Sequence, residues 1–207
     1  LEDILKIHSN LDAAERREQV VEVLKKVGLS EDHYFRFPHE LSGGQVQRLG
    51  IASALVIGPK LIVCDEPVSA LDVSIQAQIL NMLMQLQKEL GLSLLFISHD
   101  IGVIRFISDR IGVMYLGTLV EETDTEELFA NPLHPYTKGL FASVPDPYIE
   151  RDGFSELSGE QPVRTEDFKG CAFSTRCPNA TEKCRQEAPV FREVKAGHKV
   201  ACHMVKE

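Results

Sequence analysis

A short glycine-containing motif and the buried strand that follows it constrain the fold of this chain most. Leu41–Gln45 reads Leu-Ser-Gly-Gly-Gln, in which Ser42 suits a helix N-cap and the two glycines let a ligand approach the backbone. A helix start presents unpaired N–H groups that attract a phosphate. The apolar run Leu61–Cys64 then predicts a buried parallel strand that ends at Asp65 and Glu66. Ligands of open α/β sheets bind at such strand ends, so the pattern favours a nucleotide-binding α/β fold.

Size and composition agree with a folded domain and a smaller module. The chain has 207 residues, 43% hydrophobic residues and a net charge of −9, without a long Lys/Arg cluster, so a nucleic-acid partner is not expected. Its longest apolar stretches, such as Leu92–Ile97, are too short to cross a bilayer, and no signal peptide is evident. The chain opens on Leu1 rather than Met, which suggests a fragment or a processed chain.

Hydrophobic periodicity and capping residues predict the other elements. Helices are expected over 10–28, with Asn10 or Asp12 as the cap, and from the glycine motif to about residue 57. The remaining expectations are a helix over 73–90, a buried strand over 92–97, a short helix over 101–107, a hairpin of 110–116 and 118–122, and a short helix with a capping box of Asp124 and Glu127 that ends at Asn131-Pro132.

Four motifs in order resemble those of ABC-type ATPases. Leu41–Gln45 resembles their signature motif, Leu61–Glu66 their Walker B strand, Ser69–Asp72 their D-loop, and His99 their switch histidine. The resemblance implies a partial P-loop NTPase sheet of α/β class, with helices, followed by a small irregular cysteine-rich C-terminal module. It covers about residues 10–207. Taken alone, each motif has an ordinary structural explanation; their shared register favours the family.

A fifth segment narrows the resemblance. Asn131–Thr137 is similar to the segment that opens the C-terminal extension of oligopeptide- and dipeptide-type ABC ATPases. The chain is thus expected to divide into residues 1–143, the C-terminal part of an ABC ATPase domain, and residues 144–207, the extension. Residues 144–170 are rich in Pro, Asp, Glu and Gly and read as a linker. The implied function is that of an ATP-binding and ATP-hydrolysing subunit of a di- or oligopeptide importer, driven by ATP-dependent dimerisation.

The resemblance assigns roles to the residues of the Walker B end. Asp65 would hold Mg²⁺, since hard cations prefer carboxylate oxygen. Glu66 would polarise the water that attacks the γ-phosphate, and His99 would contact that phosphate. A histidine at a strand end would by itself more often be an ordinary satisfied side chain.

The resemblance also places part of the ATP site on the signature motif and the D-loop. Subunits of the family join head to tail, so Ser42, Gly43, Gly44 and Gln45 would bind ATP held by a second subunit. Asp72 would lie at that dimer interface; its alternative role is an N-cap for the next helix. The family usually has Arg where this chain has Val46 and Ser53, which puts polar contacts of those guanidinium groups in doubt.

One component of the family's site is missing from these 207 residues. No G-x-x-x-x-G-K-[ST] phosphate loop and no Gly-Lys pair occur, and the adenine-stacking aromatic residue and the Gln loop are missing too. We therefore expect no ATPase activity from this chain alone, although the intact subunit would be an ATPase.

Five cysteines fall into two groups. Cys64 lies in the apolar strand and is expected to be buried. Cys171, Cys177, Cys184 and Cys202 have the spacing C-x5-C-x6-C-x17-C within the last 37 residues. Clustered thiols in a cytoplasmic protein indicate a metal or a cluster, and their spacing does not choose between Zn²⁺ and iron–sulfur; from chemistry alone, disulfides stay open as a third alternative. The resemblance favours a [4Fe–4S] cluster; with Zn²⁺, His198 and His203 are alternative ligands.

The implied partners are a second ABC ATPase subunit, identical or related, and transmembrane permease subunits, on the cytoplasmic face of the cell membrane. Two other functions remain open at this point. One is a non-transport ABC ATPase that acts on nucleic acid or ribosomes, some of which carry iron–sulfur clusters. The other is a non-catalytic, cluster-bearing binding module. The transported solute does not follow from the sequence, because other subunits choose the cargo.

Overall fold

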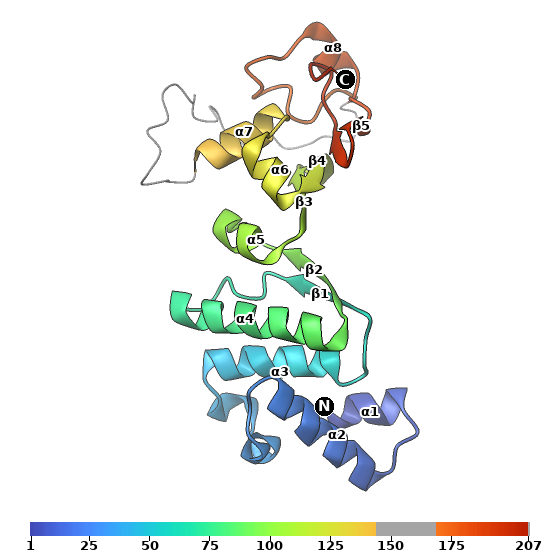
Figure 1. Ribbon diagram of the computed structural model, residues 1–207, viewed down its shortest axis with the longest axis vertical. Helices are drawn as coiled ribbons and strands as arrows, with labels where there is room; N and C mark the ends of the chain where they lie inside the picture. Colours follow the sequence, from blue (N-terminus) through green and yellow to red (C-terminus); the bar gives the residue numbers. More distant parts are fainter. Residues whose placement is uncertain (144–168, 207) are drawn as a thin grey trace. The chain divides into compact units, whose positions relative to one another are not determined.

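The computed structural model describes residues 1–143 and 169–206, and these form two compact units. The first unit comprises Leu1–Ile107 and the second Ser108–Glu207 (Figure 1). The predicted boundary between residues 143 and 144 lies at the edge of the segment outside the described residues, and 144–168 of the predicted linker lie within it, so both stay predictions.

Helices dominate the first unit, and most begin and end where the sequence predicts. The Asp12 side chain caps the second helix by accepting hydrogen bonds from Ala14 N and Glu15 N. In return, the Glu15 carboxylate accepts a hydrogen bond from Asp12 N. Gly91, at φ 64°, ends the fourth. The elements are α1 (Glu2–His8), α2 (Ala13–Lys26), the 3₁₀ turns η1 (Glu31–Phe35) and η2 (Pro38–Glu40), α3 (Gly43–Leu55), β1 (Leu61–Asp65), α4 (Val73–Leu90), β2 (Ser93–Ile97) and α5 (Ile101–Ile107).

Strands β1 and β2 are parallel neighbours joined through α4. Their register pairs Leu61 with Ser93 and Asp65 with Ile97, so both strands end at the same edge. Burial along β1 alternates: Ile62 and Cys64 are buried, as predicted for Cys64, whereas Leu61 and Val63 are 56% and 58% exposed. The prediction of a fully buried strand is therefore wrong for one face, because Ile62 and Cys64 pack into the helical core whereas Leu61 and Val63 lie outside it.

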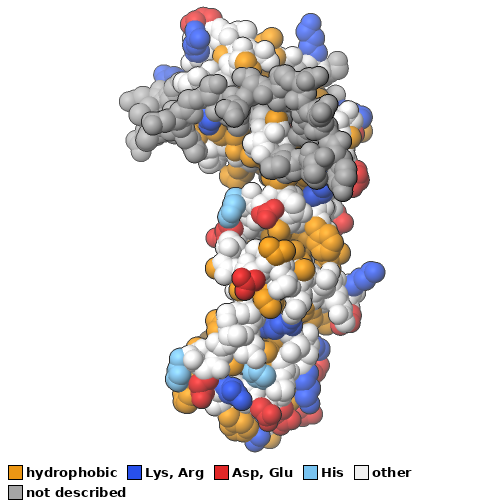
Figure 2. Space-filling model, turned by 90° about the vertical axis from the view of Figure 1, so that its left-hand side faces the viewer, with side chains coloured by type: hydrophobic (Ala, Val, Ile, Leu, Met, Phe, Trp, Pro, Cys, Tyr) orange, Lys and Arg blue, Asp and Glu red, His pale blue; other side chains and the backbone are white. Residues whose placement is uncertain are grey.

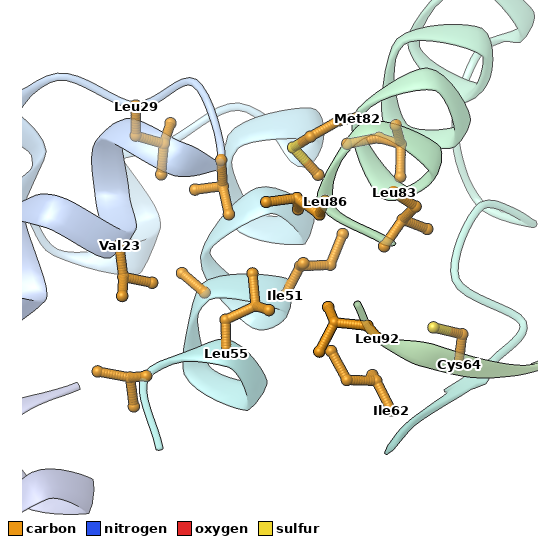
Figure 3. Packing of buried hydrophobic residues seen from close by; sticks show 14 of the residues in the cluster. Val23, Leu29, Ile51, Leu55, Ile62, Cys64, Met82, Leu83, Leu86 and Leu92 are labelled. Carbon is orange, nitrogen blue, oxygen red and sulfur yellow. The ribbon is translucent and has the colours of Figure 1, made fainter. Parts of the chain in front are cut away.

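The core of the first unit lies between its helices and the inner face of this two-stranded sheet. Figure 3 shows side chains from α2, α3 and α4 converging on Ile62 and Cys64 of β1. The residues labelled there are Val23, Leu29, Ile51, Leu55, Ile62, Cys64, Met82, Leu83, Leu86 and Leu92. None of the helices within the described ranges is both long and apolar enough to span a bilayer.

The second unit is built on a four-stranded antiparallel sheet of order β3-β4-β6-β5. The predicted hairpin is confirmed as β3 (Arg110–Tyr115) and β4 (Thr118–Asp124), with positive φ at Leu116 and Gly117 in its turn. The other elements are α6 (Thr125–Ala130), α7 (Pro135–Ala142), α8 (Glu182–Gln186), β5 (Arg192–Lys195) and β6 (His198–Val200). The C-terminal segment was expected to be irregular, but β6 pairs with β4 and extends the hairpin's sheet.

The predicted capping box of α6 is wrong. Asp124 occupies the N-cap position, yet its side chain makes no capping hydrogen bond. Instead, Asp124 accepts a hydrogen bond from Arg110 at 2.8 Å, and Glu127 accepts one from Lys195 at 2.9 Å. Both carboxylates therefore form ion pairs with residues of other strands instead of capping α6.

A buried carboxylate holds the Asn131–Thr137 segment against the sheet. Glu121, in β4, is fully buried and accepts hydrogen bonds from the backbone N–H groups of Leu133 and His134 at 2.6 and 3.0 Å. His198 Nε2, in β6, lies 2.8 Å from the same carboxylate. One side chain thus ties together β4, β6 and the start of α7.

Candidate functional site

The carboxyl ends of β1 and β2 bring together the three residues that the sequence analysis assigned to the Walker B end. Asp65 is the last residue of β1 and is exposed, and Glu66 follows it. Glu66 N donates to Ile97 O at 3.0 Å, which extends the strand pairing by one residue. His99 follows two residues after β2 ends. The parallel register therefore explains why residues 33 positions apart meet here.

Glu66 has an uncommon backbone conformation. Its φ is 48°, in the left-handed region that non-glycine residues rarely occupy. Its carbonyl accepts hydrogen bonds from the backbone N–H and the hydroxyl of Ser69, at 3.4 and 3.1 Å. These contacts hold the strained residue at the start of the D-loop, and such conformations concentrate at functional sites.

The Glu66 carboxylate contacts His99 and keeps one oxygen available. His99 Nδ1 lies 2.8 Å from Glu66 Oε1. That hydrogen bond raises the pKa of His99 above its usual value, and the carboxylate charge adds to the effect. Glu66 Oε2 is buried and has no hydrogen-bond partner. A buried acceptor without a partner suits a water molecule that is to be deprotonated or oriented.

The signature motif begins α3 with a reciprocal cap. Ser42 is the N-cap: Gln45 N donates to Ser42 Oγ at 3.4 Å, and Ser42 N donates to Gln45 Oε1 at 2.9 Å. Ser42 itself stays exposed. The motif therefore presents a helix N-terminus with an exposed hydroxyl, which is the arrangement that attracts an anion.

The two glycines of the motif differ in how much space a side chain would have. A Cβ on Gly44 would lie 2.8 Å from Ile75 Cγ2 of α4, whereas a Cβ on Gly43 would meet Leu71 Cδ2 at an ordinary 3.8 Å. The sequence analysis attributed both glycines to close approach of a ligand. For Gly44, the structure adds a packing reason: α3 and α4 approach too closely for any side chain.

Asp72 sits at the N-cap position of α4 without capping it through its side chain. Its backbone carbonyl accepts a hydrogen bond from Gln76 N at 2.8 Å, while its exposed carboxylate makes no capping hydrogen bond. The backbone therefore serves the helix, and the side chain is available to a partner.

The signature motif and the Glu66–His99 pair form two separate groups. Within the described ranges, no hydrogen bond joins Ser42 or Gln45 to Glu66 or His99. The structure instead brings the motif next to Leu71 and Ile75, in and just after the D-loop. It also gives the motif a partner that sequence reasoning missed: His33 Nε2 lies 3.1 Å from Gln45 Nε2. No spacing rule could have revealed a contact between a loop turn and a helix twelve residues later.

The four C-terminal cysteines are free thiols. Cys171 N donates to Cys184 O at 2.7 Å, which joins the segments that carry these two residues. Burial raises the pKa of the Cys171 thiol, and the nearby thiols of Cys184, Cys202 and Cys177 add smaller contributions in the same direction. Nevertheless, the parts of the chain that are described contain no group of three or more His, Cys, Asp or Glu arranged to hold a metal ion. The side chains as they stand do not form a ready-made cluster site.

A groove of about 460 Å³ lies elsewhere in the first unit. Exposed carboxylates of α2, those of Glu15, Glu18 and Glu22, line it together with Lys26, whose ammonium group pairs with Glu22 at 2.6 Å. Its apolar lining comes from α2, the end of α3 and the connection from α4 to β2, including Leu55 and Leu92. Such a groove suits a segment that carries both basic and apolar side chains.

Comparison with solved structures defines the class of the fold. The chain matches cbiO1 from Clostridium perfringens, described as part of the ABC transporter complex cbiONQ, at 31% identity and a TM-score of 0.55, over 63% of this chain and 51% of that one. It matches the dimeric ATP-binding cassette MJ0796, described in a post-hydrolysis state with ADP and Pi, at 36% identity and a TM-score of 0.51, over 59% and 52%. The α/β fold is therefore that of an ABC ATPase.

Family models and curated relatives narrow the class. Residues 1–69 match the ABC transporter family, and residues 120–184 match the oligopeptide/dipeptide transporter C-terminal region. AppF of Bacillus subtilis, an oligopeptide transport ATP-binding protein, is 51% identical over 95% of this chain and 61% of its own length. DppF of Haemophilus influenzae, a dipeptide transport ATP-binding protein, is 50% identical over 98% and 62%. The chain is therefore similar, over nearly all of its length, to ATP-binding proteins of oligopeptide and dipeptide ABC transporters, and it spans about three fifths of the length of these relatives.

Proposed function

We propose that this chain is part of an ATP-binding subunit that powers the import of oligopeptides or dipeptides by ATP-dependent dimerisation. The observation that carries the proposal is the Glu66–His99 pair at the carboxyl ends of two parallel strands, with one carboxylate oxygen buried and unpartnered. The relatives named above are ATP-binding proteins of oligopeptide and dipeptide transport. The transport of oligopeptides or dipeptides and the partnership with a second ATPase subunit and permease subunits are proposed for the whole subunit.

In the proposed site, each residue has a defined role. Glu66 Oε2 orients the water that attacks the γ-phosphate, and His99 holds the carboxylate and contacts that phosphate. Asp65, exposed at the strand end, is the carboxylate suited to Mg²⁺. When bound, the ion neutralises the charge on the phosphate oxygens. Ser42 to Gln45 close over ATP held by a second subunit, and the Asp72 carboxylate lies at the interface between the two.

ATP turnover of the full-length subunit, assembled with its companion subunit, tests this proposal. Glu66→Gln should abolish turnover while ATP still binds, because the amide cannot accept the proton of the attacking water. Glu89→Gln, an exposed carboxylate on α4, is the matched control. The 207-residue chain alone should show no turnover, since it has no phosphate loop. Unchanged turnover with Glu66→Gln would overturn the assignment.

We further propose that the acidic groove on α2 receives a basic, partly apolar segment of the permease subunits at the cytoplasmic face of the membrane. Three carboxylates and one ammonium group, that of Lys26 paired with Glu22, leave the lining with a net negative charge beside its apolar residues, which supports a partner of that chemistry. Glu18→Lys should reduce recovery of permease subunits with the tagged ATPase subunit. Glu31→Lys, an exposed carboxylate of η1 that does not line the groove, is the control. Equal recovery with both variants would contradict the proposal.

We also propose that Cys171, Cys177, Cys184 and Cys202 ligate a [4Fe–4S] cluster. Four free thiols within one short segment support it, as does the backbone hydrogen bond between Cys171 and Cys184. Because the thiols are not arranged as a metal site, binding must draw them together. Anaerobically purified protein should be brown, lose its visible absorbance with dithionite, and contain iron and sulfide, all reduced by Cys184→Ser. Colourless protein that contains only zinc, or disulfide-linked cysteines, would contradict the proposal.

A further inference from the structure

We propose that His33 is a positioning residue for the signature motif: its neutral imidazole accepts a hydrogen bond from the Gln45 side chain and so fixes the cap that presents Ser42. This inference rests on the proposed role of the motif in binding ATP. It concerns a residue of η1, outside the motif and outside the Glu66–His99 pair.

Both ends of the Gln45 side chain are engaged. Its Oε1 accepts the Ser42 N–H at 2.9 Å, which determines which end of the amide is the oxygen. Its Nε2 therefore faces His33 Nε2, at 3.1 Å. An amide NH₂ group can only donate, so His33 Nε2 must be the acceptor.

This requirement determines where the imidazole proton lies. If Nε2 accepts, the ring is neutral and its proton is on Nδ1, where it is donated to Ser30 Oγ at 2.8 Å or Ser30 O at 3.2 Å. The opposite tautomer would keep a hydrogen bond from Ser30 N to Nδ1, also within reach at 3.1 Å. In that tautomer, however, the His33 Nε2–H and the Gln45 NH₂ group would both be donors, facing each other without an acceptor. The contact with Gln45 thus selects the Nδ1–H form.

The turn that carries His33 is itself anchored. Tyr34 donates a hydrogen bond from its hydroxyl to Glu2 of α1, and the Arg17 guanidinium of α2 lies 5.4 Å from the ring centres of both Tyr34 and Phe35. His33 is therefore presented from a turn held by two helices. Because its turn is anchored, His33 restrains the Gln45 side chain and does not move with it.

The consequence is that the exposed N-terminus of α3 has a fixed geometry before any nucleotide arrives. Gln45 cannot rotate away without losing its hydrogen bonds to Ser42 and His33 together. Preorganised donors cost no reorganisation when the anion binds, which is the advantage of such a contact.

The first test is NMR spectroscopy of the isotope-labelled 207-residue chain at neutral pH. Long-range nitrogen–proton correlations should show His33 with a protonated Nδ1 and an unprotonated Nε2. The Gln45 side-chain amide protons should exchange slowly. His33→Leu should make that exchange fast, whereas His33→Gln, which offers an oxygen acceptor at similar reach, should keep it slow. An Nε2–H tautomer, or amide exchange that His33→Leu does not alter, would overturn the inference.

The second test uses ATP turnover of the full-length subunit with its companion. His33→Leu should lower kcat about threefold to tenfold, the effect of losing one positioning hydrogen bond, and His33→Gln should restore most of it. In a Gln45→Ala background, His33→Leu should have no further effect. Additive losses from the two substitutions would overturn the inference. If Gln45→Ala and Ser42→Ala leave turnover unchanged while the NMR contact is confirmed, the proposed role of the motif fails and the positioning contact stands.

Discussion

At the scale of single residues, the absence of a side chain at position 44 is as consequential as any functional group. A Cβ there would lie 2.8 Å from the Cγ2 methyl group of Ile75. Because this methyl group is attached to a β-branched carbon, it cannot move away as the end of a long side chain can. The motif therefore keeps glycine for helix packing as well as for any ligand.

Gly44→Ala should destabilise the chain by about 1–3 kcal/mol, the usual cost of overpacking a tight contact. Gly50→Ala is the matched control, because it lies in the same helix and its Cβ would meet nothing within 4 Å. That control should gain about 0.5–1 kcal/mol from helix propensity. Urea unfolding measures both, and equal stability of the two variants would contradict the packing explanation.

The pairing of His99 with Glu66 predicts a titration that depends on the carboxylate. Hydrogen bonding to Glu66 raises the pKa of His99, so the protonated imidazole is favoured in the folded chain. The stabilisation is present below the imidazole's ordinary value of about 6.5 and is lost as pH rises through the raised pKa of His99.

Glu66→Gln should return the pKa of His99 toward its ordinary value, as followed by the imidazole proton resonances. The resonances of His8, an exposed histidine of α1, serve as the internal control and should not respond to this substitution. A His99 titration that is the same in both proteins would show that the contact does not form in solution.

At the scale of elements, two helices with aspartate at the N-cap allow a direct comparison. Asp12 caps α2 through its side chain, whereas the Asp72 side chain makes no capping hydrogen bond to α4. Asp12→Ala should therefore cost about 0.5–2 kcal/mol in urea unfolding. Asp72→Ala should cost only a few tenths of a kcal/mol, since it loses only its favourable charge near the helix dipole. A larger loss from Asp72→Ala would show that its role is structural.

The start of α7 predicts acid sensitivity of the second unit. His134 is 1% exposed, its Nδ1 caps α7 by accepting from Tyr136 N at 3.1 Å, and burial lowers its pKa to about 4, against a smaller opposite effect of Glu121. Because the unfolded chain binds the proton more readily, stability is complete above pH about 6.5 and falls as pH drops toward about 4. The loss should reach about 3 kcal/mol.

Unfolding in urea at pH 7 and pH 5, followed by tyrosine fluorescence, should show about 2 kcal/mol of this loss, because pH 5 lies above the lowered pKa of His134. His134→Asn retains a capping acceptor without a titratable ring, so its stability should change less between the two pH values than that of the natural chain. An equal pH dependence in both proteins would remove His134 as the cause.

Sequence reasoning predicted the elements better than the contacts between them. The bounds of α4 and α5 agree with the structure because periodicity and the Gly91 stop act within one element. Pairing of β6 with β4 and the contact of Glu121 with His198, 77 positions later, depend on the fold and leave no local pattern. The same holds for Gly44 against Ile75, and for His33 against Gln45.

At the scale of the whole molecule, the first unit has an incompletely covered sheet. Leu61 and Val63 of β1 and Leu95 and Ile97 of β2 are each 44–58% exposed on one face. Parallel sheets are ordinarily covered on both faces. Figure 2 shows hydrophobic side chains in view among acidic and basic ones on the face that it draws. The described part of the chain thus leaves room for further structure against β1 and β2.

The proposed function makes the chain one contributor to a shared ATP site. The signature motif and the Glu66–His99 pair, which share no hydrogen bond within the described ranges, would face two different nucleotides.

A structure of the assembled transporter, trapped with ATP by Glu66→Gln, tests this division most directly. The account predicts that the Ser42 hydroxyl and the backbone N–H groups of Gly43 and Gly44 lie against the γ-phosphate of a nucleotide bound by the companion subunit. Ser42 and Gly44 turned away from nucleotide and packed into an unrelated contact would contradict it.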